Sequence, residues 1–109
     1  MSKASGEFRL ELPLESASWA CREAIAGMGW GVESIEPHRL VIRRGLWGFG
    51  RDPATIEILL SEAGPEASTV VLNGRMVGFG RFDARHLNGE INRLRNAVEV
   101  AAHRLSSAS

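Results

Sequence analysis

The stretch DARHLNGEINRLRNAVEVAAHRL, residues 83–105, decides the fold because its apolar residues follow the period of an α-helix. They are separated by steps of 4, 3, 4, 3 and 4, and they are Leu87, Ile91, Leu94, Val98, Ala101 and Leu105. This spacing predicts a helix of about six turns with one apolar stripe. Asp83 is the expected N-cap. Such a helix needs a broad apolar surface to pack on, and we expect the rest of the chain to supply it.

Alternating apolar and polar residues before this helix are typical of half-buried strands. The predicted strands cover residues 7–14, 30–36, 39–44, 54–60 and 68–73. A shorter helix, capped by Ser16 or Ser18 and ending near Met28, separates the first two strands. Residues 45–53 form a glycine-rich connection, and residues 61–67 form a polar hairpin loop.

The expected order of elements is therefore β-α-β-β-β-β-α. Short links between the last four strands predict an antiparallel meander, and the first helix carries the chain from one edge of the sheet to the other. The fold class is α+β: a two-layer sandwich with a five-stranded antiparallel sheet, order 2-3-4-5-1, and two helices on one face. We expect residues 7–105 to form a single domain, with residues 1–6 and 106–109 as disordered tails.

This order of elements, with the opening FRLELPLESASWACREAI at residues 8–25, resembles the TBP-like and helix-grip group of folds. That group includes the Bet v1 and START-type ligand-binding domains. The resemblance is one of topology and covers about residues 7–105. It implies a binder that holds a small apolar or amphipathic ligand between the long helix and the sheet.

Composition excludes several classes of protein. The 13 basic and 13 acidic residues cancel, but residues 1–36 carry a net charge of −3 (three bases, six acids) and residues 37–109 carry +3 (ten bases, seven acids). This weak asymmetry could favour an anionic ligand near the second half, and it disfavours a general nucleic-acid binder. No apolar run is long enough to span a membrane. A single cysteine and the absence of a signal-peptide pattern predict a cytoplasmic protein.

No catalytic or metal-binding signature stands out. His38, His86 and His103 are far apart in the sequence, and Cys21 has no second cysteine near it, so no zinc motif is present. His86 lacks a visible base or nucleophile partner, which makes proton transfer a weak alternative. We expect no catalytic residue, no metal and no cofactor.

One unusual constellation is the word GFGR, which occurs at residues 48–51 and again at residues 78–81. In a meander, both copies fall at the same end of the sheet. Arginine beside aromatic rings can bind a carboxylate or phosphate, or stack on a flat ligand. The alternative is that the aromatics plug the end of the sandwich. The candidate ligand-binding residues are Trp30, Trp47, Phe49, Arg51, Phe79, Arg81 and Phe82.

A second candidate surface is the sheet face that the helices leave open. A solvated face should be polar throughout, yet Val41, Leu59 and Val71 fall on three neighbouring predicted strands, ringed by arginine and glutamate. An apolar centre with a charged rim is typical of a modest interface. These three residues are therefore the candidate interface for a homodimer or a protein partner.

Three functions remain open. Large inward residues predict a filled interior, which favours a non-enzymatic interaction or structural module that could self-associate. The alternative is the helix-grip binder of a small apolar or amphipathic ligand. A small enzyme of the cyclase or hydrolase type is the weakest of the three, because the residues for it are not evident.

Overall fold

The structure is a computed structural model that describes residues 2–36, 38–46, 51–76 and 81–108. These residues form five strands and two helices, in the order that the sequence predicts. The elements in chain order are β1 (Ser2–Leu10), α1 (Leu14–Gly27), β2 (Val32–Glu36), β3 (Arg39–Leu46), β4 (Arg51–Gly64), β5 (Ala67–Met76) and α2 (Arg81–Ala108).

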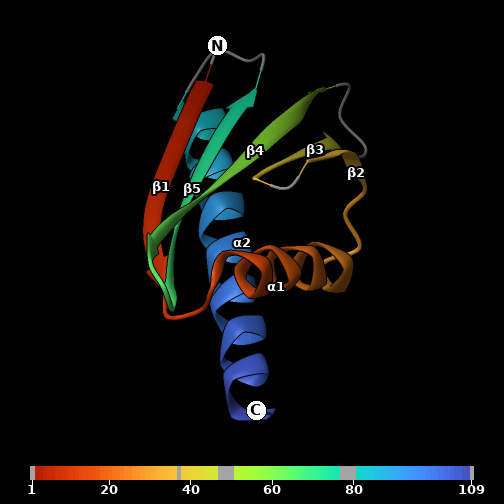
Figure 1. Ribbon diagram of the computed structural model, residues 1–109. Coiled ribbons are helices and arrows are strands. Elements are labelled where there is room, and N and C mark those ends of the chain that lie inside the picture. Colours follow the sequence, from red (N-terminus) through yellow and green to blue (C-terminus); the bar gives the residue numbers. More distant parts are fainter. Residues whose placement is uncertain (1, 37, 47–50, 77–80, 109) are drawn as a thin grey trace.

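The sheet has the order β1-β5-β4-β3-β2, with every neighbouring pair antiparallel. This confirms the predicted order, and α1 is the connection that lets β1 pair with the last strand. Both helices lie on one face of the sheet, which gives two layers (Figure 1). We call the face toward the helices the inner face and the opposite one the outer face. Within the described residues, no helix is long and apolar enough to cross a membrane.

The N-terminal segment differs from the prediction. β1 begins at Ser2 instead of Glu7, so most of the expected tail is a strand that pairs with β5, with Lys3 opposite Arg75. The tail was expected because its inward positions, Ala4 and Gly6, are too small to give an apolar alternation. At the other end, α2 continues through Ser106 and Ser107 to Ala108, where a second tail was expected.

The starts of the helices also differ. α1 begins at Leu14 with Pro13 in the N-cap position and no side-chain cap, so Ser16 and Ser18 lie inside the helix and are not caps. Proline is tolerated there because the first turn of a helix has backbone N–H groups with no intrahelical partner. α2 begins at Arg81, two residues before Asp83, the expected cap.

The β4–β5 hairpin is longer than predicted. Most of the expected polar loop at residues 61–67 is strand, and only Pro65 and Glu66 form the turn, between Gly64 and Ala67. Leu59 pairs with Val71 near the middle of this hairpin. The added strand length extends the outer face at both ends.

The core is a single cluster between the layers. The stripe of α2 packs there as predicted, with Leu87, Leu94 and Val98 fully buried and Ile91 nearly so. It meets inward residues of the sheet, all under 2% exposed, namely Leu40, Ile42, Ile56, Ile58, Val70 and Leu72. Small residues of α1, Ala17, Ala20 and Cys21, are also fully buried and let the two helices pack closely. The described apolar residues of the two layers therefore share one buried core.

Gly74 explains how α2 approaches the sheet so closely. A Cβ added at Gly74 would lie 3.0 Å from Leu87 Cδ1 and 3.1 Å from Ile91 Cδ1, whereas one added at Gly6 would lie at an ordinary 3.7 Å from Ile91 Cγ2. Gly74 was expected to mark a bulge, but it pairs regularly with Ala4 and Ile56. Its role is to leave room for α2.

Alanine at these two glycines should therefore have different effects. Gly74→Ala should lower the free energy of unfolding by about 1 kcal/mol, because Leu87 and Ile91 must shift. Gly6→Ala should be neutral or stabilising by up to about 1 kcal/mol, because alanine restricts the unfolded chain without a clash. Urea melts of both variants measure this, and equal midpoints would show that the close approach at Gly74 is unimportant.

Candidate binding surface

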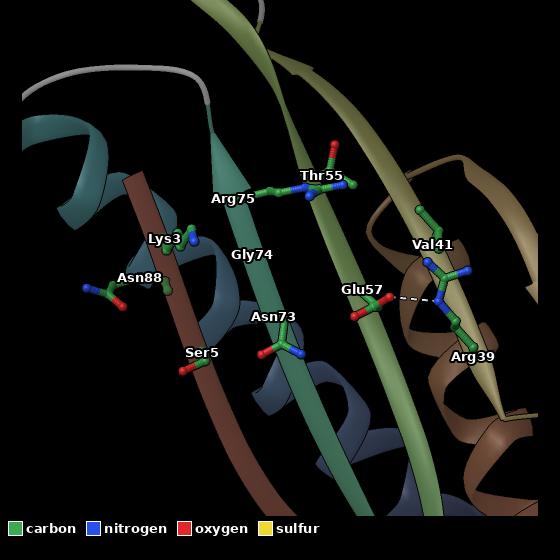
Figure 2. Close-up of a pocket in the computed structure, with 11 residues that line it drawn as sticks. Lys3, Ser5, Arg39, Val41, Thr55, Glu57, Asn73, Gly74, Arg75 and Asn88 are labelled. Carbon is green, nitrogen blue, oxygen red and sulfur yellow. Dashed lines mark hydrogen bonds and ion pairs between the residues drawn. The ribbon is translucent and has the colours of Figure 1, made fainter. Parts of the chain in front are cut away.

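A hollow of about 740 Å³ lies mainly on the outer face and runs from β1 across β5 and β4 to β3. We call it the outer-face groove. Figure 2 shows its side chains in front of the helices, with Asn88 of α2 beyond the β1 end. Its principal lining side chains are Lys3, Arg39, Val41, Thr55, Glu57, Asn73 and Arg75.

Strand pairing sets the groove out in transverse rows, because paired residues in antiparallel strands point to the same face. In the first row, Arg75 lies opposite Lys3 on one side and Thr55 on the other. The next row places Ser5, Asn73, Glu57 and Val41 side by side. The third row contains Glu7, Val71, Leu59 and Arg39. The groove thus has a cationic end, and the apolar pair Val71 and Leu59 lies on the same face, four residues further along each strand.

An ion pair lies at the β3 end of the groove. Arg39 Nε donates a hydrogen bond of 2.7 Å to Glu57 Oε2 (Figure 2), and Arg39 Nη1 also lies 3.7 Å from Glu36 Oε1. The hydrogen bond to Glu57 and its negative charge raise the pKa of Arg39, which keeps this guanidinium charged. Because both side chains are partly exposed, we expect this pair to orient them more than to stabilise the fold.

The other two cations of the groove are not neutralised. Lys3 and Arg75 have no ion pair within the part of the chain that the structure describes. The Arg75 side chain extends from β5 toward Thr55 on β4 (Figure 2). Three cations against the single anion Glu57 give the lining a net charge of +2. A guanidinium and an ammonium group held beside half-buried polar side chains can bind a carboxylate or another anion.

The thiol of this chain lies in the core and not in the outer-face groove. No cluster of three potential metal ligands occurs among the described residues. Cys21, the lone thiol, is fully buried on α1 in the core and far from solvent, and burial raises its pKa to about 12. The groove itself presents charged and apolar side chains, which can bind a ligand that carries both kinds of group.

The residues predicted around the GFGR words are only partly described. Trp47, Phe49 and Phe79 lie outside the described residues, and for Arg51, Arg81 and Phe82 only the backbone is described. Arg51 opens β4 opposite Leu46, and Arg81 opens α2. Trp30 is half-buried and packs against the core beside α1, where its backbone N–H donates to the carbonyl oxygen of Ile25. A joint site of these seven residues stays a prediction.

The predicted interface residues Val41, Leu59 and Val71 are half-buried on the outer face. Val41 lines the groove, and the other two form the adjacent cross-strand pair. Sequence reasoning did not place Lys3, Ser5 and Arg75 there, because it began the first strand at Glu7 and ended the last strand at Asn73. The polar residues Lys3, Ser5, Glu7 and Arg9 do alternate along this segment, but Ala4 and Gly6 between them are too small to indicate a buried face.

Comparison with known proteins shows the fold. No family model and no curated protein matches the chain. A START superfamily protein from Mycobacterium smegmatis superposes with a TM-score of 0.71 at 10% identity, over 96% of this chain and 99% of that one. CalU16 from Micromonospora echinospora superposes with a TM-score of 0.69 at 12% identity, over 92% of this chain and 75% of that one. The di-domain ARO/CYC BexL from the BE-7585A biosynthetic pathway superposes with a TM-score of 0.65 at 9% identity, over 94% of this chain and 45% of that one.

These similarities confirm the resemblance inferred from the order of elements: the chain has a START-like, helix-grip fold. At 9–12% identity they carry no information about individual residues. The function has to be argued from the surfaces of this chain.

Proposed function

We propose that this protein is a non-enzymatic binding module of the cytoplasm whose outer-face groove holds an acidic segment of a partner protein. The observation that carries the proposal is the row of Lys3 and Arg75, two cations without an ion pair in the described chain, on the same sheet face as the half-buried pair Leu59 and Val71, which lies four residues further along β4 and β5. A ligand that presents carboxylates beside an apolar side chain complements both features.

The charge of the groove argues against a second copy stacked on the same face. In a two-fold sheet-to-sheet dimer, the groove would face its own image, so Lys3, Arg39 and Arg75 would lie opposite a surface of the same net charge. Like charges brought together at an interface disfavour association. Val41, Leu59 and Val71 therefore serve as the apolar part of a surface for a different, acidic protein.

A second candidate function is the helix-grip mode, in which a small apolar or amphipathic ligand lies between α2 and the sheet. One observation favours it: α2 packs mainly on β1 and β5, and α1 packs on β4 and β5, so neither helix packs strongly on β2 or β3 in the described residues. The START superfamily and ARO/CYC descriptions of the structural neighbours agree with this mode or with a cyclase activity. The large apolar side chains buried between the layers, Ile56, Ile58 and Leu94, support the outer face instead.

The proposal is tested by titrating the isotope-labelled protein with a short peptide rich in glutamate that contains leucine. Backbone amide signals of Lys3, Glu57 and Asn73 should shift together, and the affinity should fall as salt is added, because the contacts are between exposed charges. Arg75→Glu should weaken binding by roughly tenfold or more, since an attraction becomes a repulsion.

Arg22→Glu is the matched control, because it makes the same charge change on α1, away from the outer face. It should bind the peptide like the wild type. Equal binding by Arg75→Glu and the wild type would contradict the proposal. Suppose that a fatty acid shifts the amide signals of Leu40 and Ile42, while the peptide shifts none on the outer face. That result would favour the helix-grip mode instead.

A further inference from the structure

The helix layer carries an apolar hollow of its own, on the side away from the sheet. This hollow, which we call the helix groove, has a volume of about 640 Å³ and lies between α1 and α2. Its lining includes Trp19, Glu23 and Met28 beside Ala97, Val100 and Arg104. It belongs to neither the outer-face groove nor the core.

Exposure of large apolar side chains is concentrated there. Among the described residues, the large hydrophobic side chains that are exposed are Trp19 at 46%, Ile35 at 57% and Val100 at 51%. Trp19 and Val100 line the helix groove from opposite walls. A tryptophan exposed beside other apolar groups is a typical anchor of a protein interface.

The two walls of the helix groove carry charges of opposite sign. On α1, the exposed Trp19 is followed four residues later by Glu23; on α2, the exposed Val100 is followed four residues later by Arg104. Residues four apart in a helix lie on one side, one turn apart. Each wall thus presents an apolar residue and a charge, with opposite signs on the two walls. Within the described residues, neither Glu23 nor Arg104 has an ion pair.

We propose that the helix groove is a two-fold interface between two copies of this chain. A two-fold axis places α1 of one copy against α2 of the other, so Trp19 meets Val100 of the second copy and Glu23 meets its Arg104, each contact occurring twice. The net charge of this pair of residues is zero, so it offers no attraction to an anionic lipid surface or to a strongly acidic partner. The helix groove is best matched by a surface that carries one acidic and one basic side chain at the same spacing. The helix groove of a second copy of this chain is such a surface.

The dimer should be weak. The groove is lined by 11 residues, roughly half of the 20–30 per partner in a standard stable interface. We therefore expect a dissociation constant in the range of about 10–100 µM. The dimer would leave the outer face of each copy free, so this inference does not depend on the proposed function.

Sedimentation velocity over a concentration series tests the dimer. The wild type should shift from monomer to dimer, while Glu23→Arg and Arg104→Glu should each stay monomeric, because each places like charges together at both contacts. An equimolar mixture of the two variants should dimerise again, since both contacts then pair opposite charges. Restoration by mixing also shows that each variant is folded.

Arg85→Glu, an exposed charge reversal near the start of α2, is the control and should dimerise like the wild type. A wild type that remains monomeric at about 1 mM would overturn the inference, since a complex weaker than that is not a specific dimer. A dimer that survives both single reversals, or a mixture that fails to associate, would overturn it as well. Trp19→Ser should also abolish the dimer while leaving the peptide titration of the outer face unchanged.

Discussion

Replacing Leu94 by alanine should lower the free energy of unfolding by about 2–5 kcal/mol. Leu94 is fully buried at the centre of the α2 stripe, in the cluster that also contains Ile56, Ile58 and Leu72. The truncation removes apolar contacts, and neighbours held in two packed layers can only partly fill the cavity that remains. α2 depends on these contacts because a single amphipathic helix gains most of its stability from packing.

Urea melts of the Leu94→Ala variant measure this loss. Asn92→Ala on the exposed side of the same helix serves as the control, with an expected change within about 0.5 kcal/mol. A loss below about 1 kcal/mol for Leu94→Ala would mean that α2 is not docked on the sheet. A loss of similar size in both variants would instead indicate an effect on helix formation in general.

Stability should fall steeply at alkaline pH because of Cys21. Burial raises the pKa of this thiol from 9.0 to about 12. Between these two values the unfolded chain loses the thiol proton while the folded chain keeps it, so the folded state binds more protons and stability declines as pH rises. The slope approaches about 1.4 kcal/mol per pH unit once the unfolded thiol is mostly ionised, which gives a loss of roughly 2 kcal/mol between pH 9 and pH 11.

The chain is well suited to this measurement, because it contains no tyrosine and only one lysine, so few other groups titrate in that window. Urea melts at pH 8, 9, 10 and 11 should show the decline in the wild type. Cys21→Ala should be less stable at pH 8 but nearly independent of pH. A wild-type profile as flat as that of the alanine variant would contradict burial of the thiol, as would rapid labelling of Cys21 by a thiol reagent in the folded protein.

The outer-face groove shows which of its residues the alternation of apolar and polar residues predicts and which it does not. The alternation of the central strands alone predicts that seven side chains in or beside the groove point to the outer face. They are Arg39, Val41, Thr55, Glu57, Leu59, Val71 and Asn73. Lys3 and Arg75 did not follow, because the strand that carries Lys3 has Ala4 and Gly6 at its inward positions. Such small residues do not signal a buried face in the sequence. They are inward because α2 lies directly over them, which only the packed structure shows.

The sequence by itself determined the order of elements, the antiparallel sheet with β1 beside β5, and the inward residues of α2 and the central strands. Those features depend on hydrophobic period and on link length, which are local properties of the chain. The tertiary structure decided where β1 begins, why Gly74 is needed, and which charges share a groove. It also brought Trp19 of α1 and Val100 of α2 to the same groove. These features depend on contacts between segments far apart in the chain, and the crossing of two helices leaves no periodic pattern in either one.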